Sequence, residues 1–204
     1  MRQTITYSNE FEGFPINAKE GQGCYLSALS KIRSHLKYMT ESYTRVTLIR
    51  FDLRFPEGYI NALDNSNIIR FHDSLETYYR RKGITMKFFW AREQSRKSIY
   101  NNRFHYHCYI LLDGHRIRKA NKVIERANIL WKHALGINVN DPCKLIHICN
   151  FKETGHWEVR LEKKNQNFTR LAYDCHYWLS YLAKVNTKEN GPHRNFGGSM
   201  LSQY

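Results

Sequence analysis

The order in which strand-like and helix-like segments follow one another constrains the fold of this chain most. Strand-like segments are short, rich in β-branched and aromatic residues, and end at turn signals such as Pro56 and Asp113–Gly114. Helix-like segments carry apolar residues three and four apart. After an opening helix the order is strand, helix, strand, strand, helix, strand, strand, helix. This order predicts an α+β domain with a central antiparallel sheet of about five strands and helices packed mainly on one face.

The boundaries of these segments follow from the same patterns. The chain of 204 residues is expected to form a single domain over residues 1–204, since that length can bury a core without disulfides or metal. We expect an N-terminal arm over 1–20 and an irregular C-terminal tail over 186–204. Helices are predicted over 24–39, 62–82, 117–135 and 168–185, and strands over 43–56, 84–93, 103–112, 144–151 and within 156–163.

The chain is strongly basic. It carries 32 Lys and Arg against 18 Asp and Glu, a net charge of +14, which favours a polyanionic partner, most commonly nucleic acid. The positive residues are spread along the chain, which is typical of a folded basic surface. The candidates for nucleic-acid binding surround one loop: Arg92, Arg96, Lys97 and Arg103. Tyr100 and Trp157 are candidates for stacking on unpaired bases.

Other features exclude several classes of protein. The five cysteines form no CxxC pair and no signal peptide is recognisable, so we expect reduced thiols and a cytoplasmic location. No stretch approaches the 18 apolar residues of a membrane span. There is no GxxxxGK[ST] motif, so no P-loop NTPase or helicase module is expected.

Two histidines one residue apart interrupt the apolar strand "RFHYHCYILLDG". Side chains at i and i+2 of a strand share a face, so His105 and His107 project side by side. Glu93 ends the preceding strand, and a hairpin would place its carboxylate beside them. Two nitrogens and a carboxylate with open positions suit Mn²⁺ or Mg²⁺ better than a closed zinc site. The alternatives are a hydrogen-bonded surface pair of histidines and, as a rival ligand, His147.

The last predicted helix presents a second group of reactive residues. In "YDCHYWLSYLAK", Tyr177 and Tyr181 are four residues apart and Lys184 follows three later, all within a narrow wedge beside the apolar stripe. A phenol is a poor nucleophile at its ordinary pKa of about 10. A divalent ion on a phosphate and a nearby ammonium group would both assist its attack. The alternative is that these tyrosines only pack with their rings, which we prefer for Tyr173.

Taken together, "HYH" on a strand and "YWLSYLAK" on a later helix resemble the HUH family of single-strand DNA endonucleases, which includes rolling-circle replication initiators and relaxases. More narrowly, "LIRFDLRFP", "FHYHCYILLDG", "YLAKV" and "RNFGGS" are similar to inovirus replication-initiator-like proteins of prophages, over roughly residues 45–199. The resemblance implies a palm-like five-stranded sheet. It also implies His105, His107 and Glu93 as metal ligands, Tyr181 as nucleophile, Tyr177 as a second tyrosine, and Lys184 beside them.

The function implied by this resemblance is metal-dependent nicking and joining of single-stranded DNA, or a DNA hairpin at a replication origin, through a 5′-phosphotyrosine. A helicase would be supplied by the host. Two alternatives stay open: a relaxase or transposase with the same site, and a basic nucleic-acid-binding regulator that uses its sheet without catalysis.

Overall fold

A six-stranded antiparallel sheet lies at the centre of the computed structural model, which describes residues 4–18, 21–59, 64–94, 104–117, 119–185 and 194–201. Its neighbours run β10–β6–β7–β5–β8, and β9 pairs with the N-terminal half of β5 beside β8. The strands are β5 (Arg45–Leu53), β6 (Met86–Gln94), β7 (Phe104–Asp113), β8 (Ile146–Ile148), β9 (Glu158–Glu162) and β10 (Phe196–Gly198). The predicted α+β class and antiparallel sheet are confirmed.

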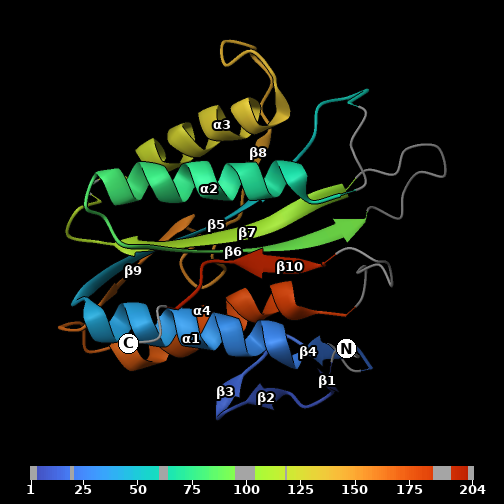
Figure 1. The fold of residues 1–204 in the computed structure, drawn as a ribbon. Helices are drawn as coiled ribbons and strands as arrows, with labels where there is room; N and C mark the ends of the chain where they lie inside the picture. Colours follow the sequence, from blue (N-terminus) through green and yellow to red (C-terminus); the bar gives the residue numbers. More distant parts are fainter. Residues whose placement is uncertain are drawn as a thin grey trace.

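The helices cover both faces of this sheet, as Figure 1 shows. Helices α2 (Ser66–Arg81) and α3 (Asn121–Leu135) lie on one face, and α1 (Leu26–Ser42) and α4 (Phe168–Ser180) lie on the other. The sequence predicted helices mainly on one face. The burial of β5 explains the even division, because eight of its nine residues are buried and a strand so enclosed needs cover on both sides.

Alternate residues of each strand therefore enter two separate cores. Leu48, Phe89 and Tyr109 pack against α1 and α4, whereas Phe51, Phe88 and Tyr106 pack against α2 and α3. Because successive side chains of a strand point to opposite faces, this alternation determines which side chains lie on the same face as the candidate site. None of the helices in the described ranges is long and apolar enough to cross a membrane.

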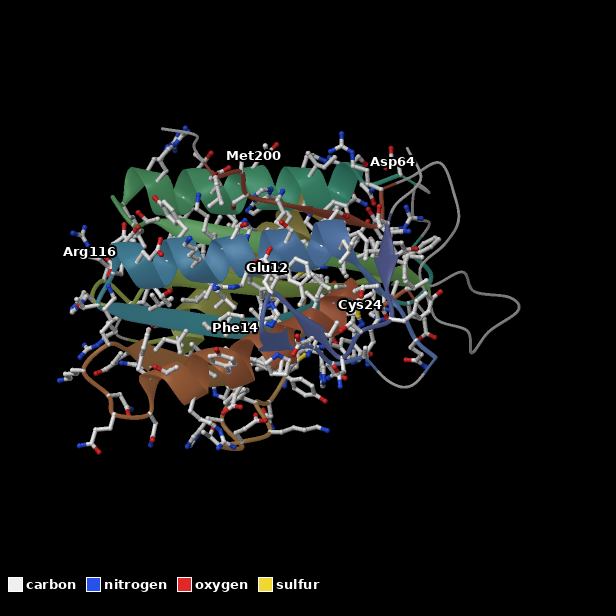
Figure 2. All side chains as sticks on the ribbon, turned by 90° about the horizontal axis from the view of Figure 1, so that it is seen from below. Glu12, Phe14, Cys24, Asp64, Arg116 and Met200 are labelled. Carbon is white, nitrogen blue, oxygen red and sulfur yellow. The ribbon has the colours of Figure 1, made fainter. Side chains whose placement is uncertain are left out.

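Short strands organise the N-terminal segment that the sequence predicts as an arm. β1 (Ile5–Thr6) pairs with β4 (Cys24–Tyr25), and β2 (Glu10–Phe11) pairs with β3 (Phe14–Pro15). Phe14 stacks on Tyr173 of α4 with ring centroids 4.3 Å apart, and the Arg33 guanidinium of α1 lies 3.9 Å from its ring centroid. In the view from below, Phe14 and Cys24 lie on the side of α1 and α4 (Figure 2). The segment thus joins these two helices.

The C-terminal tail corrects one prediction. The sequence predicts an irregular segment over 186–204, yet β10 pairs with Phe89–Ala91 of β6 and becomes an edge strand of the sheet. Its glycines permit a very close approach, since a Cβ on Gly197 would lie 2.4 Å from the Trp90 ring. Taken from the sequence alone, the glycines indicate a loop. In the structure they allow the backbone of β10 to lie against the Trp90 ring. Residues 186–193 and 202–204 lie outside the described residues.

His35 connects α1, β7 and the tail from within the core. Its Nδ1 accepts a hydrogen bond from the Tyr109 hydroxyl (3.0 Å), and its Nε2 donates to the Ser199 carbonyl (2.9 Å). Burial lowers the pKa of His35 from 6.5 to about 3, so the ring stays neutral in the folded protein. The unfolded chain therefore binds more protons than the folded one between these pH values, and stability falls as the pH falls.

We expect acid to destabilise the protein partly through this residue. Between pH 6.5 and 4.5, His35 contributes a loss of roughly 2 kcal/mol, and His35→Gln, which keeps one donor and one acceptor, has a shallower dependence. Urea denaturation at a series of pH values measures the difference. The exposed His133→Gln is the control and follows the wild type. A His35→Gln curve parallel to the wild-type curve would contradict the assignment.

Candidate active site

The candidate site is built from rows of side chains that cross the sheet on the α1–α4 face. In the register of β6, β7 and β5, Glu93 pairs with His105, and the next row of that face places Ala91, His107 and Asp52 side by side. The same row continues into β8, where His147 pairs with Asp52. Antiparallel pairing thus brings together residues that lie far apart in the sequence.

Glu93, His105 and His107 form a compact set of metal-type ligands. One ligand atom of each lies within 4.8 Å of the other two. His107 Nε2 lies 3.1 Å from Glu93 Oε2 and 3.1 Å from His105 Nε2. The hairpin of β6 and β7 therefore brings the three predicted ligands together. Two nitrogens and one carboxylate oxygen fit a divalent cation such as Mn²⁺ or Mg²⁺.

Asp52 orients the inner histidine of this set. Its Oδ1 lies 2.5 Å from His107 Nδ1, and because a carboxylate can only accept, Nδ1 carries the proton. His107 then presents Nε2 to Glu93 and His105, as a ligand held by an outer carboxylate does. Burial by itself lowers the pKa of His107, but its hydrogen bonds to Asp52 and Glu93 outweigh it and raise the pKa.

His105 differs from its neighbour in the direction in which its pKa is shifted. Burial and the adjacent His107 both lower the pKa of His105, whereas the bonds to Asp52 and Glu93 raise that of His107. The carboxylates of Asp52 and Glu93 therefore favour the protonated form of His107. A bound cation would lie in the same space between the ligand atoms of Glu93, His105 and His107. A divalent cation would replace this proton.

We expect Asp52→Asn to weaken Mn²⁺ binding by about 10- to 100-fold, the usual cost of losing an outer partner of a metal-bound histidine. The amide keeps the size of the side chain but removes the charge that holds the Nδ1 proton. Titration followed by the electron paramagnetic resonance signal of free Mn²⁺ measures the affinity. Asp73→Asn, at an exposed position of α2, is the control and leaves the affinity unchanged. An unchanged affinity in Asp52→Asn would remove Asp52 from the site.

Tyr181 lies against His107 of the ligand set. The final α-helix ends at Ser180 and continues as the 3-10 turn η1 (Tyr181–Ala183). The Tyr181 ring lies edge to face against His107, with ring centroids 5.5 Å apart. The Lys184 ammonium lies 4.2 Å and the Arg50 guanidinium 4.6 Å from the Tyr181 ring centroid. The Tyr181 phenol therefore lies next to two positively charged side chains, Arg50 and Lys184, and next to His107 of the ligand set.

The electrostatics of Tyr181 depend on the carboxylates around it. Burial raises the pKa of Tyr181 and the Glu93 charge raises it further, whereas Arg50 opposes them. The phenol is therefore protonated at neutral pH when the site holds no cation. A divalent ion beside Glu93 would cancel the carboxylate charge and favour the phenolate.

A pocket of about 470 Å³ opens beside Tyr181. Arg50, Tyr177, Trp178 and Lys184 are among the residues that line it. Arg50 is buried and donates from Nη1 to the Trp178 carbonyl (3.2 Å), while its buried Nε meets no acceptor among the described residues. Arg50 and Lys184 therefore bring positive charge to the pocket next to the phenol, as an anion site requires.

The other predicted tyrosines differ in their surroundings. Tyr177 is 41% exposed and lines the same pocket, one helical turn before Tyr181. It can therefore reach a ligand in the pocket without the backbone moving. Tyr173, one turn earlier, stacks on Phe14, which confirms the packing role predicted for it.

Of the residues predicted to bind or stack on nucleic acid, the structure describes only Arg92 and Trp157. Arg92 is only 4% exposed, lies on the α2–α3 face and holds its guanidinium 3.8 Å from the Phe104 ring centroid. Neighbouring strand residues point to opposite faces, so Arg92 cannot share the surface of Glu93. Its position is that of a packed core residue. Trp157 is partly buried against the α2–α3 core. Arg96, Lys97, Tyr100 and Arg103 lie outside the described residues.

Three residues of the site were missed by the sequence analysis: Arg50, Asp52 and Cys149. Arg50 and Asp52 lie two residues apart in the apolar strand "LIRFDL", so they share one face of it. Charged residues on a buried strand often have a functional role, and this pattern could have identified them. His147 is not a ligand of the His105 pair; it lies with Asp52 and Cys149.

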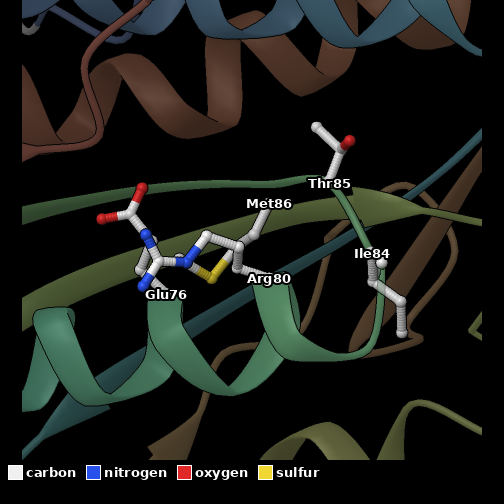
Figure 3. A pocket seen from close by; sticks show the side chains of 6 residues that line it. Glu76, Arg80, Ile84, Thr85 and Met86 are labelled. Carbon is white, nitrogen blue, oxygen red and sulfur yellow. The ribbon is translucent and has the colours of Figure 1, made fainter.

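A separate pocket of about 350 Å³ lies where α2 leads into β6 (Figure 3). Glu76, Arg80, Ile84, Thr85 and Met86 are among the residues that line it. Among the described residues, its lining contains no histidine, cysteine or tyrosine, so it offers no phenol and no set of metal ligands comparable to those on the opposite face.

Comparison with known proteins identifies the family. A family model described as the YagK/YfjJ C-terminal domain matches residues 7–199, nearly the whole chain and all elements of the site. No curated protein matches the chain.

Proposed function

We propose that this chain, which belongs to the YagK/YfjJ C-terminal domain family, nicks and rejoins single-stranded DNA through a phosphotyrosine formed by Tyr181. The observation that carries the proposal is the contact of the Tyr181 ring with His107 of the ligand set, while Tyr181 also lines a pocket together with Arg50 and Lys184. The net charge of +14 supports a polyanionic substrate.

A divalent cation fits the site, because Glu93, His105 and His107 converge and Asp52 holds the tautomer that leaves Nε2 of His107 available. When bound, Mn²⁺ or Mg²⁺ would withdraw charge from the scissile phosphate and help orient it. Glu93 and His105 would position it from β6 and β7, which are rigid strands of the sheet.

The residues of the chain have separate roles in the reaction. The Tyr181 oxygen forms a bond to phosphorus as the bond from phosphorus to the 3′ oxygen breaks. The phenol loses its proton to water and the leaving 3′ oxygen takes one up, so the protons balance. Arg50 and Lys184 stabilise the charge on the phosphoryl oxygens in the transition state. The phosphotyrosine keeps the energy of the diester, so a 3′ hydroxyl can reverse the step without ATP.

Tyr177 would act in a second transfer. It lines the pocket of Tyr181 one helical turn away, so a DNA end joined to Tyr181 would lie beside the Tyr177 side chain. Such an exchange would close a circle at the end of rolling-circle replication, the role that the resemblance to inovirus-type initiators implies. A host helicase would supply the unwound strand.

Incubation with 5′- or 3′-labelled single-stranded DNA tests the proposal. With Mn²⁺, the protein is expected to become joined to the 5′ phosphate of the fragment downstream of the cut, so the adduct carries the 3′ label and not the 5′ label. Chelation by EDTA abolishes it. A relaxase or transposase would give the same adduct on a different substrate. Tight binding without an adduct, over a set of hairpin and random sequences, would instead identify a regulator.

A further inference from the structure

A second group of metal-type side chains lies beside the first ligand set and shares Asp52 with it. β8 places His147 opposite Asp52 of β5. The ladder continues beyond the end of β8, since the Cys149 amide donates to the Arg50 carbonyl (3.1 Å). Cys149 is therefore two residues from His147 on the same face, and one ligand atom each of Asp52, His147 and Cys149 lies within 4.8 Å of the other two.

We propose that Asp52, His147 and Cys149 form a second cation site, which takes Zn²⁺ or a similarly thiophilic divalent ion. The ligands of the two sites differ in kind. Glu93 with His105 and His107 offers oxygen and nitrogen, whereas Cys149 adds a sulfur, and thiolates select zinc-like ions over Mn²⁺ and Mg²⁺. Asp52 stands between the sites as ligand of one and outer partner of His107 in the other.

The geometry of the second site suits a tetrahedral ion. Cys149 Sγ lies 3.5 Å from Asp52 Oδ1. Bonds of about 2.3 Å to sulfur and about 2.1 Å to oxygen, at a tetrahedral angle, place these ligand atoms about 3.6 Å apart. The ion can therefore bind between them with almost no movement of this pair.

The site is also accessible. His147 is exposed, and Cys149 lines the pocket beside Tyr181. Three protein ligands leave a fourth position open, as in zinc sites that bind water or substrate. The thiol hydrogen of Cys149, which points to Asp52, is the proton that the ion displaces: the S–H bond breaks, the S–metal bond forms and one proton leaves to solvent.

Cobalt titration tests the inference without DNA, and so independently of the nuclease proposal. Co²⁺ added to the reduced, EDTA-treated protein is expected to produce a thiolate-to-cobalt charge-transfer band in the near ultraviolet. Stoichiometric Zn²⁺ removes the band, while an equal amount of Mg²⁺ does not. Cys149→Ser abolishes it, and His147→Gln, at an exposed position that folding tolerates, weakens Co²⁺ binding by about tenfold or more.

Two variants serve as matched controls. Cys143→Ser removes another partly exposed cysteine and leaves the band intact. His105→Ala removes a ligand of the first site only and also leaves it intact. Absence of the band in the wild type, or its persistence in Cys149→Ser, would overturn the proposal, as would an unchanged affinity in His147→Gln. An adduct with DNA in a protein that fails this test would leave the nuclease proposal standing.

Discussion

Tyr181→Phe is expected to lower the formation of the covalent protein–DNA adduct by at least about 1000-fold, the scale of losing a nucleophile. The change removes one oxygen from a ring that otherwise keeps its contact with His107 and its place beside Arg50 and Lys184. Folding and DNA affinity should therefore remain near those of the wild type. Denaturing electrophoresis of the labelled adduct measures the first quantity, and fluorescence anisotropy measures the affinity.

Tyr177→Phe is the matched control, since it removes the same atom one helical turn away. Cleavage is expected to persist in this variant within a few fold, because the ring contact with His107 is made by Tyr181, whereas Tyr177 is 41% exposed. Transfer of the bound strand to a second DNA end should fall instead. An adduct that survives in Tyr181→Phe and disappears in Tyr177→Phe would reverse the roles of the two tyrosines.

Much of the architecture could be predicted from local patterns. The strand from 103 to 112 is observed as Phe104–Asp113, and the helix from 168 to 185 as Phe168–Ser180 followed by a 3-10 turn. These segments have strong periodicity and clear ends. β10 was missed because its three residues Phe-Gly-Gly acquire their strand conformation only from pairing with β6. Its stabilisation is tertiary, and no local pattern records it.

The site shows the same division between local and long-range information. The i and i+2 spacing of His105 and His107 and the position of Glu93 in a hairpin are local, and the structure brings these residues together. Asp52 joins them through the pairing of β5 with β7, across 55 residues, which depends on strand order. Arg92 was placed on the basic surface by composition, although the alternation applied to the histidines puts it on the face opposite Glu93.

Removing one ligand of the first site is expected to abolish cation-dependent chemistry. His105→Ala should weaken Mn²⁺ binding by more than about 100-fold, beyond the effect of losing an outer partner such as Asp52. His105 is a better position for this substitution than His107. His107 also contacts Tyr181 and forms a hydrogen bond with Asp52, so its loss would disturb both residues. Adduct formation should fall in parallel, because the phosphate is then activated only by Arg50 and Lys184.

His147→Ala distinguishes a specific loss from a general one. It removes a histidine of the same face, one strand beyond Asp52, and is expected to leave Mn²⁺ binding and adduct formation unchanged. Calorimetric titration with Mn²⁺ and the adduct assay on the same preparations give both readings. If His105→Ala retained the Mn²⁺ affinity and the adduct of the wild type, the paired histidines would be structural. Tyr181 would then have to act with Arg50 and Lys184 alone, and EDTA would not inhibit the reaction.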